Sequence, residues 1–222
     1  EYDARQRQLI SISTRVSNPG CYAITSIAIL HPLIANGLLP AEWPITINAV
    51  SGYSGGGKKL ISDFENKNSA DYTNSAFYTY GLPLKHKHVP EITKWSGLMH
   101  APIFIPSVGR YRQGMVVQVP LPLWFMTHAP KPEDIHAILA DHYAKCMFVS
   151  VAPLADSAAM DRLDPEELNG TNMLFLYIFA NNQTKQAVIM GVIDNLGKGA
   201  SGQAVQNMNI MLGLPEETGL TR

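Results

Sequence analysis

Asn18-Pro19-Gly20-Cys21-Tyr22 leads directly into the apolar run 24–38, and this stretch organises the rest of the chain. The run predicts a helix that closes near Gly37 and Pro40. Cys21 then lies at or near the helix N-terminus, where unpaired N–H groups and the helix dipole favour a thiolate. A thiolate is a nucleophile, so the stretch indicates covalent catalysis. The alternative is a cysteine that serves as a small buried hydrophobe.

Both strands and helices are expected along the rest of the chain. The strand beginning at Pro44 shows the clearest pattern, with Ile45, Ile47 and Ala49 on one face. The expected strands are 44–50, 102–107, 115–122, 147–152, 173–179 and 187–193, with 77–84 extended, and the further helices are 90–98, 132–145 and 200–212. The pattern predicts an α+β fold with a mixed or antiparallel sheet covered by helices.

The composition is that of an ordinary folded protein, with 222 residues, 46% hydrophobic content and a net charge of −1. Such a charge provides no basic footprint for nucleic acid, and no apolar run is long enough to span a membrane. The two cysteines, Cys21 and Cys146, are too few and too far apart for a disulfide framework or a zinc site. We therefore expect no metal, no membrane, no nucleic acid and a reducing, cytoplasmic location.

Four motifs in a fixed order carry a resemblance to a known family. Asn18–Tyr22 is followed by Ser51-Gly-Tyr-Ser-Gly-Gly-Gly-Lys58, by His86-Lys-His-Val-Pro-Glu-Ile92 and by the glycine-rich stretch 194–207. In this order they resemble the shorter bacterial subtype of N-acetyl-gamma-glutamyl-phosphate reductase, over residues 17–220. The resemblance implies a domain like the catalytic domain of glyceraldehyde-3-phosphate and aspartate-semialdehyde dehydrogenases. Ala23 departs from the proline that many relatives carry there.

The resemblance also implies a reaction. Cys21 would attack the acyl phosphate of N-acetyl-L-glutamyl 5-phosphate, and NADPH would reduce the resulting thioester to the semialdehyde, a step of arginine biosynthesis. Three alternatives stay open: the same chemistry on an aminoadipate-type acyl phosphate, a thiol hydrolase, and a non-catalytic dimerisation fragment. A homo-oligomer, dimer or tetramer, is expected in each family-based case.

Two histidines, His86 and His88, are the candidate acid–base groups, because imidazole titrates near the operating pH. If the segment is extended, both rings face one side and Lys87 points away. Composition alone would equally fit a solvated basic loop. The resemblance favours a catalytic pair without deciding which histidine is the base, with a slight preference for His88. It also implies that Tyr80 belongs to the substrate pocket.

The glycine-rich loop 51–58 can hold an anion, since glycines allow close backbone approach and serines donate hydrogen bonds. The resemblance assigns Gly52, Ser54 and Gly55 to the cofactor and Ser51 to the substrate, whereas an ordinary strand-to-helix turn is the alternative. Arg112 is a candidate for an acidic substrate, with Arg110 as its rival. From the C-terminal motif, the resemblance carries over Asn195, Lys198 and Gly199 as cofactor-binding residues; a plain core helix fits the same spacing.

The expected organisation has three parts. Residues 1–16 are expected to be the tail of a nucleotide-binding region, 17–196 the catalytic and dimerisation domain, and 197–222 a C-terminal helix that packs on the nucleotide-binding domain. No dinucleotide fingerprint follows a strand near the start of the sequence. We therefore expect this chain to be a catalytic-domain fragment of a longer enzyme.

Overall fold

A single mixed sheet of seven strands forms the base of the structure, a computed structural model that describes residues 1–126 and 128–222. The strand order is β2-β3-β1-β4-β7-β6-β5. β1 runs parallel to β3 and β5 parallel to β6, whereas the remaining neighbours are antiparallel. The strands are β1 (Thr46–Gly52), β2 (Phe77–Thr79), β3 (Ile103–Gly109), β4 (Met115–Pro122), β5 (Val149–Val151), β6 (Leu174–Asn181) and β7 (Gln186–Ile193).

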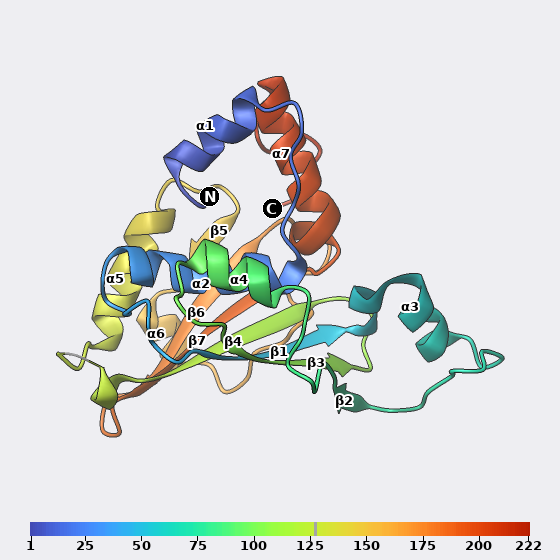
Figure 1. Ribbon diagram of the computed structural model, residues 1–222, viewed down its shortest axis with the longest axis horizontal. Helices are drawn as coiled ribbons and strands as arrows, with labels where there is room; N and C mark the ends of the chain where they lie inside the picture. Colours follow the sequence, from blue (N-terminus) through green and yellow to red (C-terminus); the bar gives the residue numbers. More distant parts are fainter. Residues whose placement is uncertain (127) are drawn as a thin grey trace.

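Helices cover one face of this sheet, and two of them rise above it (Figure 1). The helices are α1 (Ala4–Ile12), α2 (Cys21–Ala35), α3 (Gly57–Glu65), α4 (Val89–Ser96), α5 (Pro132–Tyr143), α6 (Leu154–Ala158) and α7 (Gly202–Leu212). α2, α4 and α5 lie over the sheet, α1 packs beside α7 above them, and α3 projects sideways (Figure 1). A π-helical turn, Gly197–Ser201, joins β7 to α7.

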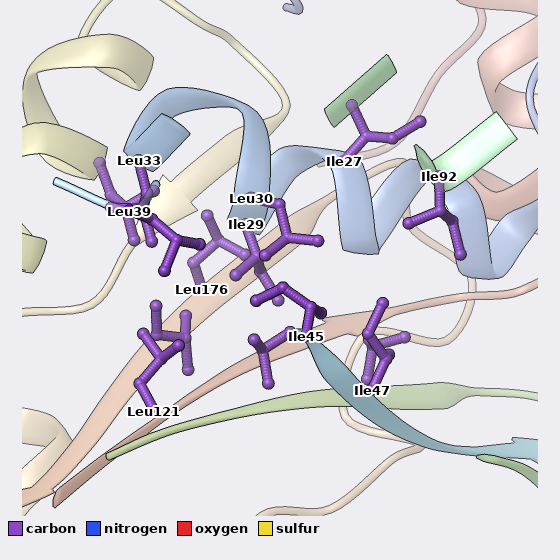
Figure 2. Close-up of a cluster of buried hydrophobic side chains, with 14 of the residues drawn as sticks. Ile27, Ile29, Leu30, Leu33, Leu39, Ile45, Ile47, Ile92, Leu121 and Leu176 are labelled. Atoms are coloured by element: carbon purple, nitrogen blue, oxygen red, sulfur yellow. The ribbon is translucent and has the colours of Figure 1, made fainter. Parts of the chain in front are cut away.

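The main core lies between α2 and the sheet (Figure 2). Ile29, Leu30 and Leu33 of α2 are fully buried, and they face Ile47 of β1 and Leu176 of β6. Burying an aliphatic side chain of this size contributes about 1.5–3 kcal/mol. The helix that begins at Cys21 is therefore held firmly along its length.

The opposite face of the sheet is only partly covered. Residues of the segment between α5 and β6, among them Phe148 and Leu168, pack on Val116, Tyr177 and Val192. Towards the other edge, Ile103 and Ile105 of β3 are 52% and 36% exposed.

Most expected elements are confirmed, including the alternation of β1, where Ile45, Ile47 and Ala49 are buried. Two local expectations were wrong. The extended segment 77–84 ends as a strand at Thr79, because positive φ angles at Gly81 and Leu84 turn the chain. The last helix begins at Gly202 rather than Ala200, since the preceding residues form the π-helical turn.

Candidate active site

Cys21 is the first residue of α2, as the Pro-Gly turn before it predicts, with Gly20 as the N-cap. The thiol is half-buried, and the turn that leads to α7 packs behind it: a Cβ on Gly199 would come within 2.8 Å of the Cys21 Cβ. Burial raises the pKa of the Cys21 thiol, although the backbone N–H groups of Tyr22 and Cys21 oppose this shift. The expectation that the helix start makes this thiol acidic was therefore wrong, because the desolvation of the thiolate outweighs the helix N–H groups.

His88 lies against the residue that precedes the thiol. A Cβ on Gly20 would lie 2.0 Å from His88 Nε2, so only glycine leaves room for the ring. His88 is 7% exposed, and burial, with smaller contributions from His86 and Lys87, lowers its pKa to about 4. The imidazole is therefore neutral at pH 7, and its Nδ1 has no hydrogen-bond partner among the described residues. The neutral imidazole thus lies against Gly20, one residue before the thiol, and a neutral imidazole is the form that can accept a proton.

His86 stands beside His88, with ring centroids 4.8 Å apart and the planes at 75°. The segment is a turn rather than an extended strand, since Val89 N–H donates to the His86 carbonyl oxygen, so the extended geometry was wrong. The two rings nevertheless lie in contact, and the backbone N–H of His88 donates to the ring Nδ1 of His86 over 3.2 Å. Burial, followed by the charge of Lys87, lowers the pKa of His86.

Tyr22 and Tyr80 connect this pair to the sheet. The Tyr80 hydroxyl donates to the Tyr22 hydroxyl over 3.2 Å, and the latter donates to the Ser107 carbonyl oxygen over 3.4 Å. The ring centroid of Tyr22 is 5.7 Å from that of His86, and the Tyr80 centroid is 5.8 Å from it. Tyr80 thus lies with the histidines, and its role in a substrate pocket stays a prediction. Burial raises the pKa of both phenols, so both are proton donors at neutral pH.

Glu91 is a site residue that the sequence reasoning did not single out. It lies in the first turn of α4, and its Oε2 accepts a hydrogen bond from the Gly20 N–H over 3.1 Å. Its position in the motif His86-Lys-His-Val-Pro-Glu91 was the available signal, since it follows His88 by three residues, close to one helical turn.

The glycine-rich loop meets the C-terminal motif next to this centre. Asn195 is 2% exposed; its Nδ2 donates to Ser54 Oγ over 3.0 Å, and its Oδ1 accepts from the Gly114 N–H over 2.8 Å. Gly55 packs closely on Ser51, where a Cβ would lie 2.9 Å from Oγ. A Cβ on Gly52 would lie 2.6 Å from the backbone of Arg112. These residues form one cluster, in which the Ser51 hydroxyl donates to the Gly52 carbonyl oxygen over 2.9 Å.

Two predicted site residues have their charges engaged elsewhere. The Arg112 side chain is 60% exposed and pairs with Glu65 over 3.6 Å, and Arg110 contacts Thr73 and Asn74. Lys198 is fully buried, and its Nζ lies 2.6–2.7 Å from both carboxylate oxygens of Glu1 and 2.7 Å from Gln206 Oε1. Neither cation faces Cys21 as a free charge.

A cavity of 370 Å³ lies on the α1 and α7 side of the centre, where Asn18, Pro19, Glu91 and Asn207 line it. Within 1–126 and 128–222, no group of histidine, cysteine or acidic side chains could hold a metal ion. In the same residues, no helix has the length and apolarity that crossing a bilayer requires. The second thiol, Cys146, is half-buried at the end of α5, and burial raises its pKa.

The sequence of this chain also matches a known protein family. The sequence family described as semialdehyde dehydrogenase, dimerisation domain, matches residues 21–195. The chain belongs to this family.

Similar proteins indicate which group within this family the chain resembles. The chain is 50% identical over 226 residues to N-acetyl-gamma-glutamyl-phosphate reductase 2 of Nostoc sp., a match that covers 99% of this chain and 70% of the relative. It is also 50% identical over 208 residues to N-acetyl-gamma-glutamyl-phosphate reductase of Brucella ovis, covering 94% and 67%. Within the wider family, the chain therefore falls among the N-acetyl-gamma-glutamyl-phosphate reductases, as the motif order predicts.

Solved structures confirm the fold. Aspartate semialdehyde dehydrogenase II from Vibrio cholerae superposes with a TM-score of 0.63 at 17% identity, over 89% of this chain. The chain spans 62% of the length of that structure. The predicted likeness to this type of catalytic domain is correct, and at this identity it concerns the fold alone.

Proposed function

We propose that this protein reduces N-acetyl-L-glutamyl 5-phosphate to N-acetyl-L-glutamate 5-semialdehyde and phosphate. This reaction would be a step of arginine biosynthesis in the cytoplasm. The observation that carries the proposal is the contact of neutral His88 with Gly20, directly before Cys21 at the start of α2. The names of the relatives at 50% identity support the same substrate.

In the proposed mechanism, the Cys21 thiol and the His88 imidazole both start in their neutral forms. As Cys21 Sγ attacks the acyl carbon, His88 takes the thiol proton, the C–O bond to phosphate breaks, and a thioester remains on Cys21. When the thioester carbon is reduced, His88 gives its proton to the carbonyl oxygen, and a thiohemiacetal forms on Cys21. His88 then takes the hydroxyl proton back as the C–S bond breaks and the semialdehyde leaves, and it passes this proton to the Cys21 thiolate. The raised pKa of Cys21 makes the base necessary, because little thiolate exists at pH 7.

A nicotinamide cofactor, NADP in this proposal, supplies the hydride when it is bound. The residues proposed to bind it are Gly52, Ser54, Gly55, Asn195 and Gly199. The three glycines pack on Arg112, Ser51 and Cys21, so their missing Cβ atoms serve close packing inside the protein, and their contact with the cofactor stays a prediction. Lys198 fits less well as a direct cofactor ligand, since its ammonium is already bound by Glu1 and Gln206.

Tyr80 and Ser51 are the proposed substrate-binding residues. Tyr80 donates to the Tyr22 hydroxyl next to the histidines, and Ser51 lies at the end of β1, where Gly55 packs on it. Arg112 would have to leave Glu65 in order to bind a substrate carboxylate, and it remains a prediction. An aminoadipate-type acyl phosphate is the alternative substrate.

The direct test is the reverse reaction. The protein, incubated with N-acetyl-L-glutamate 5-semialdehyde and either NADP⁺ or NAD⁺, should reduce NADP⁺ only when inorganic phosphate is present, and Cys21→Ser should abolish this reaction. Faster turnover of the aminoadipate semialdehyde would reassign the substrate. Ester hydrolysis without nicotinamide reduction would support a thiol hydrolase, although a hydrolase needs a third group to orient its histidine, and none bonds His88 Nδ1 among the described residues.

We further propose that a second copy of the chain covers the open face of the sheet. The name of the family, a dimerisation domain, supports this occupant. The surface consists of Phe77, Ile103 and Ile105, which the strand register places on one side of β2 and β3. Ile105→Lys should shift sedimentation from dimer to monomer, whereas Leu82→Lys, on an exposed turn outside the sheet, should not. A native chain that stays monomeric at high concentration would refute this interface.

A further inference from the structure

The joint between α2 and α4 is held from two sides at Gly20. Its N–H is one of the donors that the start of α2 leaves without a helical acceptor, and Glu91 Oε2 accepts it over 3.1 Å. Its Cα is covered by the His88 ring. Since His88 and Glu91 belong to the same turn of chain at the start of α4, the carboxylate and the imidazole contact α2 together.

The orientation of His88 depends on this joint. Its Nδ1 has no hydrogen-bond partner in the described part of the chain, so no acceptor fixes the ring from behind. The ring packs on Gly20, Tyr22 and His86. Any shift of the first turn of α4 therefore moves the base relative to Cys21.

An electrostatic role for Glu91 would work against the thiolate. A carboxylate near the thiol raises the pKa of Cys21, whereas Lys87 lowers it. The other titratable groups around this centre are His86 and His88, whose pKa values are lowered, and Tyr22 and Tyr80, which are uncharged at neutral pH. Glu91 is thus the only negative charge among the groups acting on Cys21 in the described residues.

We infer that Glu91 is a positioning residue: its hydrogen bond to the Gly20 N–H fixes α4 on α2 and so holds His88 in reach of the Cys21 thiol. This inference rests on the proposed function of Cys21 and His88. The negative charge of Glu91 disfavours the Cys21 thiolate, whereas the tether that its hydrogen bond to Gly20 provides keeps His88 in place as the base.

The test measures iodoacetamide alkylation of Cys21 against pH, by peptide mass spectrometry, with and without His88→Asn. In the native chain, His88→Asn should slow alkylation at pH 7 by on the order of tenfold, since the base is lost. Glu91→Leu removes the tether, so His88→Asn should then change the rate less than twofold. Glu91→Asp, which keeps the charge but is one methylene shorter, should lose most of the same effect and serves where Glu91→Leu does not fold.

Glu91→Gln separates the tether from the charge, because its amide oxygen can still accept the Gly20 N–H. The tenfold effect of His88→Asn should persist in it, while the pH midpoint of Cys21 alkylation moves down and the rate at pH 7 rises about two- to fivefold. Glu133→Gln, an exposed carboxylate in the first turn of α5, is the matched control and should behave as the native chain.

The outcomes distinguish the inference from the function on which it rests. If His88→Asn slows Cys21 in the native chain and slows it equally in folded Glu91→Leu or Glu91→Asp, Glu91 does not position His88 and only the inference fails. If His88→Asn has no effect in the native chain, the acid–base assignment fails first and the inference fails with it. An unmoved pH midpoint in Glu91→Gln would likewise remove the carboxylate from the surroundings of Cys21.

Discussion

Replacing Lys198 with methionine removes the buried charge that anchors the turn behind Cys21. The Lys198 side chain is 0% exposed, and its Nζ bonds both oxygens of Glu1 and the Oε1 of Gln206, while the ring of Phe148 lies 5.6 Å away. Methionine fills a similar volume and tolerates an aromatic neighbour. The substitution therefore removes the ion pair with little change in packing.

Lys198→Met should lower the free energy of unfolding strongly, because the Glu1 carboxylate would lose its ion-pair partner while remaining in place. The Glu1 side chain is 14% exposed, so its carboxylate would remain mostly buried without the ammonium group that bonds both of its oxygens, and only the positive charge of its own α-amino group would stay near it. Breaking a buried pair in this way costs about 3–5 kcal/mol. For a chain of this size, each 1 kcal/mol lowers Tm by about 2–4 °C, so a Tm decrease of about 6–20 °C follows.

Urea unfolding of four chains measures this effect: the native chain, Lys198→Met, Glu1→Gln and the double variant. The double variant should lose less than the sum of the single losses, because no unpaired charge remains in it. A loss below about 1 kcal/mol for Lys198→Met, or strictly additive losses, would refute a buried ion pair. Fluorescence and circular dichroism should give the same transition if the unfolding is two-state.

The pH dependence of this pair has a definite sign. Burial alone would raise the pKa of Glu1, but the charge of Lys198 outweighs it and the folded-state pKa lies below the ordinary 4.5. The pair therefore contributes its full stability above pH 4.5, and the contribution is lost as the pH falls through the lowered pKa. The stability difference between the native chain and Glu1→Gln should shrink over that acidic range.

Three further predictions concern the site. Gly20→Ala should lower the free energy of unfolding in urea by about 1–3 kcal/mol and displace His88, because the new Cβ would meet the imidazole ring. The φ of −70° at Gly20 suits alanine, so backbone strain would not be the cause. An unchanged free energy of unfolding would contradict the contact between Gly20 and His88. The pKa of His88 is about 4 in the folded chain, against the usual 6.5. As the pH falls from 6.5 to 4, the unfolded chain protonates this imidazole first, so the native chain should lose stability relative to His88→Asn. Equal pH profiles of the two chains would exclude a buried neutral imidazole. Asn195→Ala should cost about 1–3 kcal/mol, since it leaves the buried Gly114 N–H without its acceptor, and a loss below 0.5 kcal/mol would remove Asn195 from this structural role.

Local patterns in the sequence predicted much of the fold. The Pro-Gly turn before Cys21, the alternation of β1 and the hairpin of β6 and β7 each depend on neighbouring residues, and each is confirmed. α1 was not predicted because none of its residues is buried, so it carries no apolar stripe. The π-helical turn also escaped prediction, since no local pattern separates it from the start of α7.

The candidate site divides in the same way. The structure places His86, His88 and Tyr80 together, with His88 against Gly20 next to Cys21, and the roles that the resemblance implies for these residues stay predictions. The direction of the Cys21 pKa shift depends on tertiary burial, which the helix start does not reveal. The pairing of Lys198 with Glu1 joins residues 197 positions apart, and no spacing rule in a single sequence predicts such a contact.

The central claim is that Cys21 forms a thioester with an acyl phosphate, and the most direct measurement is to trap that thioester. The protein is mixed with acetyl phosphate, or with N-acetyl-L-glutamyl phosphate generated in place, in the absence of nicotinamide cofactor, and is then quenched in acid and mapped by mass spectrometry. The account predicts one acyl group on Cys21 that hydroxylamine removes, none on Cys146, and a much slower appearance in His88→Asn. Acylation of Cys146 alone, or of neither cysteine, would contradict it.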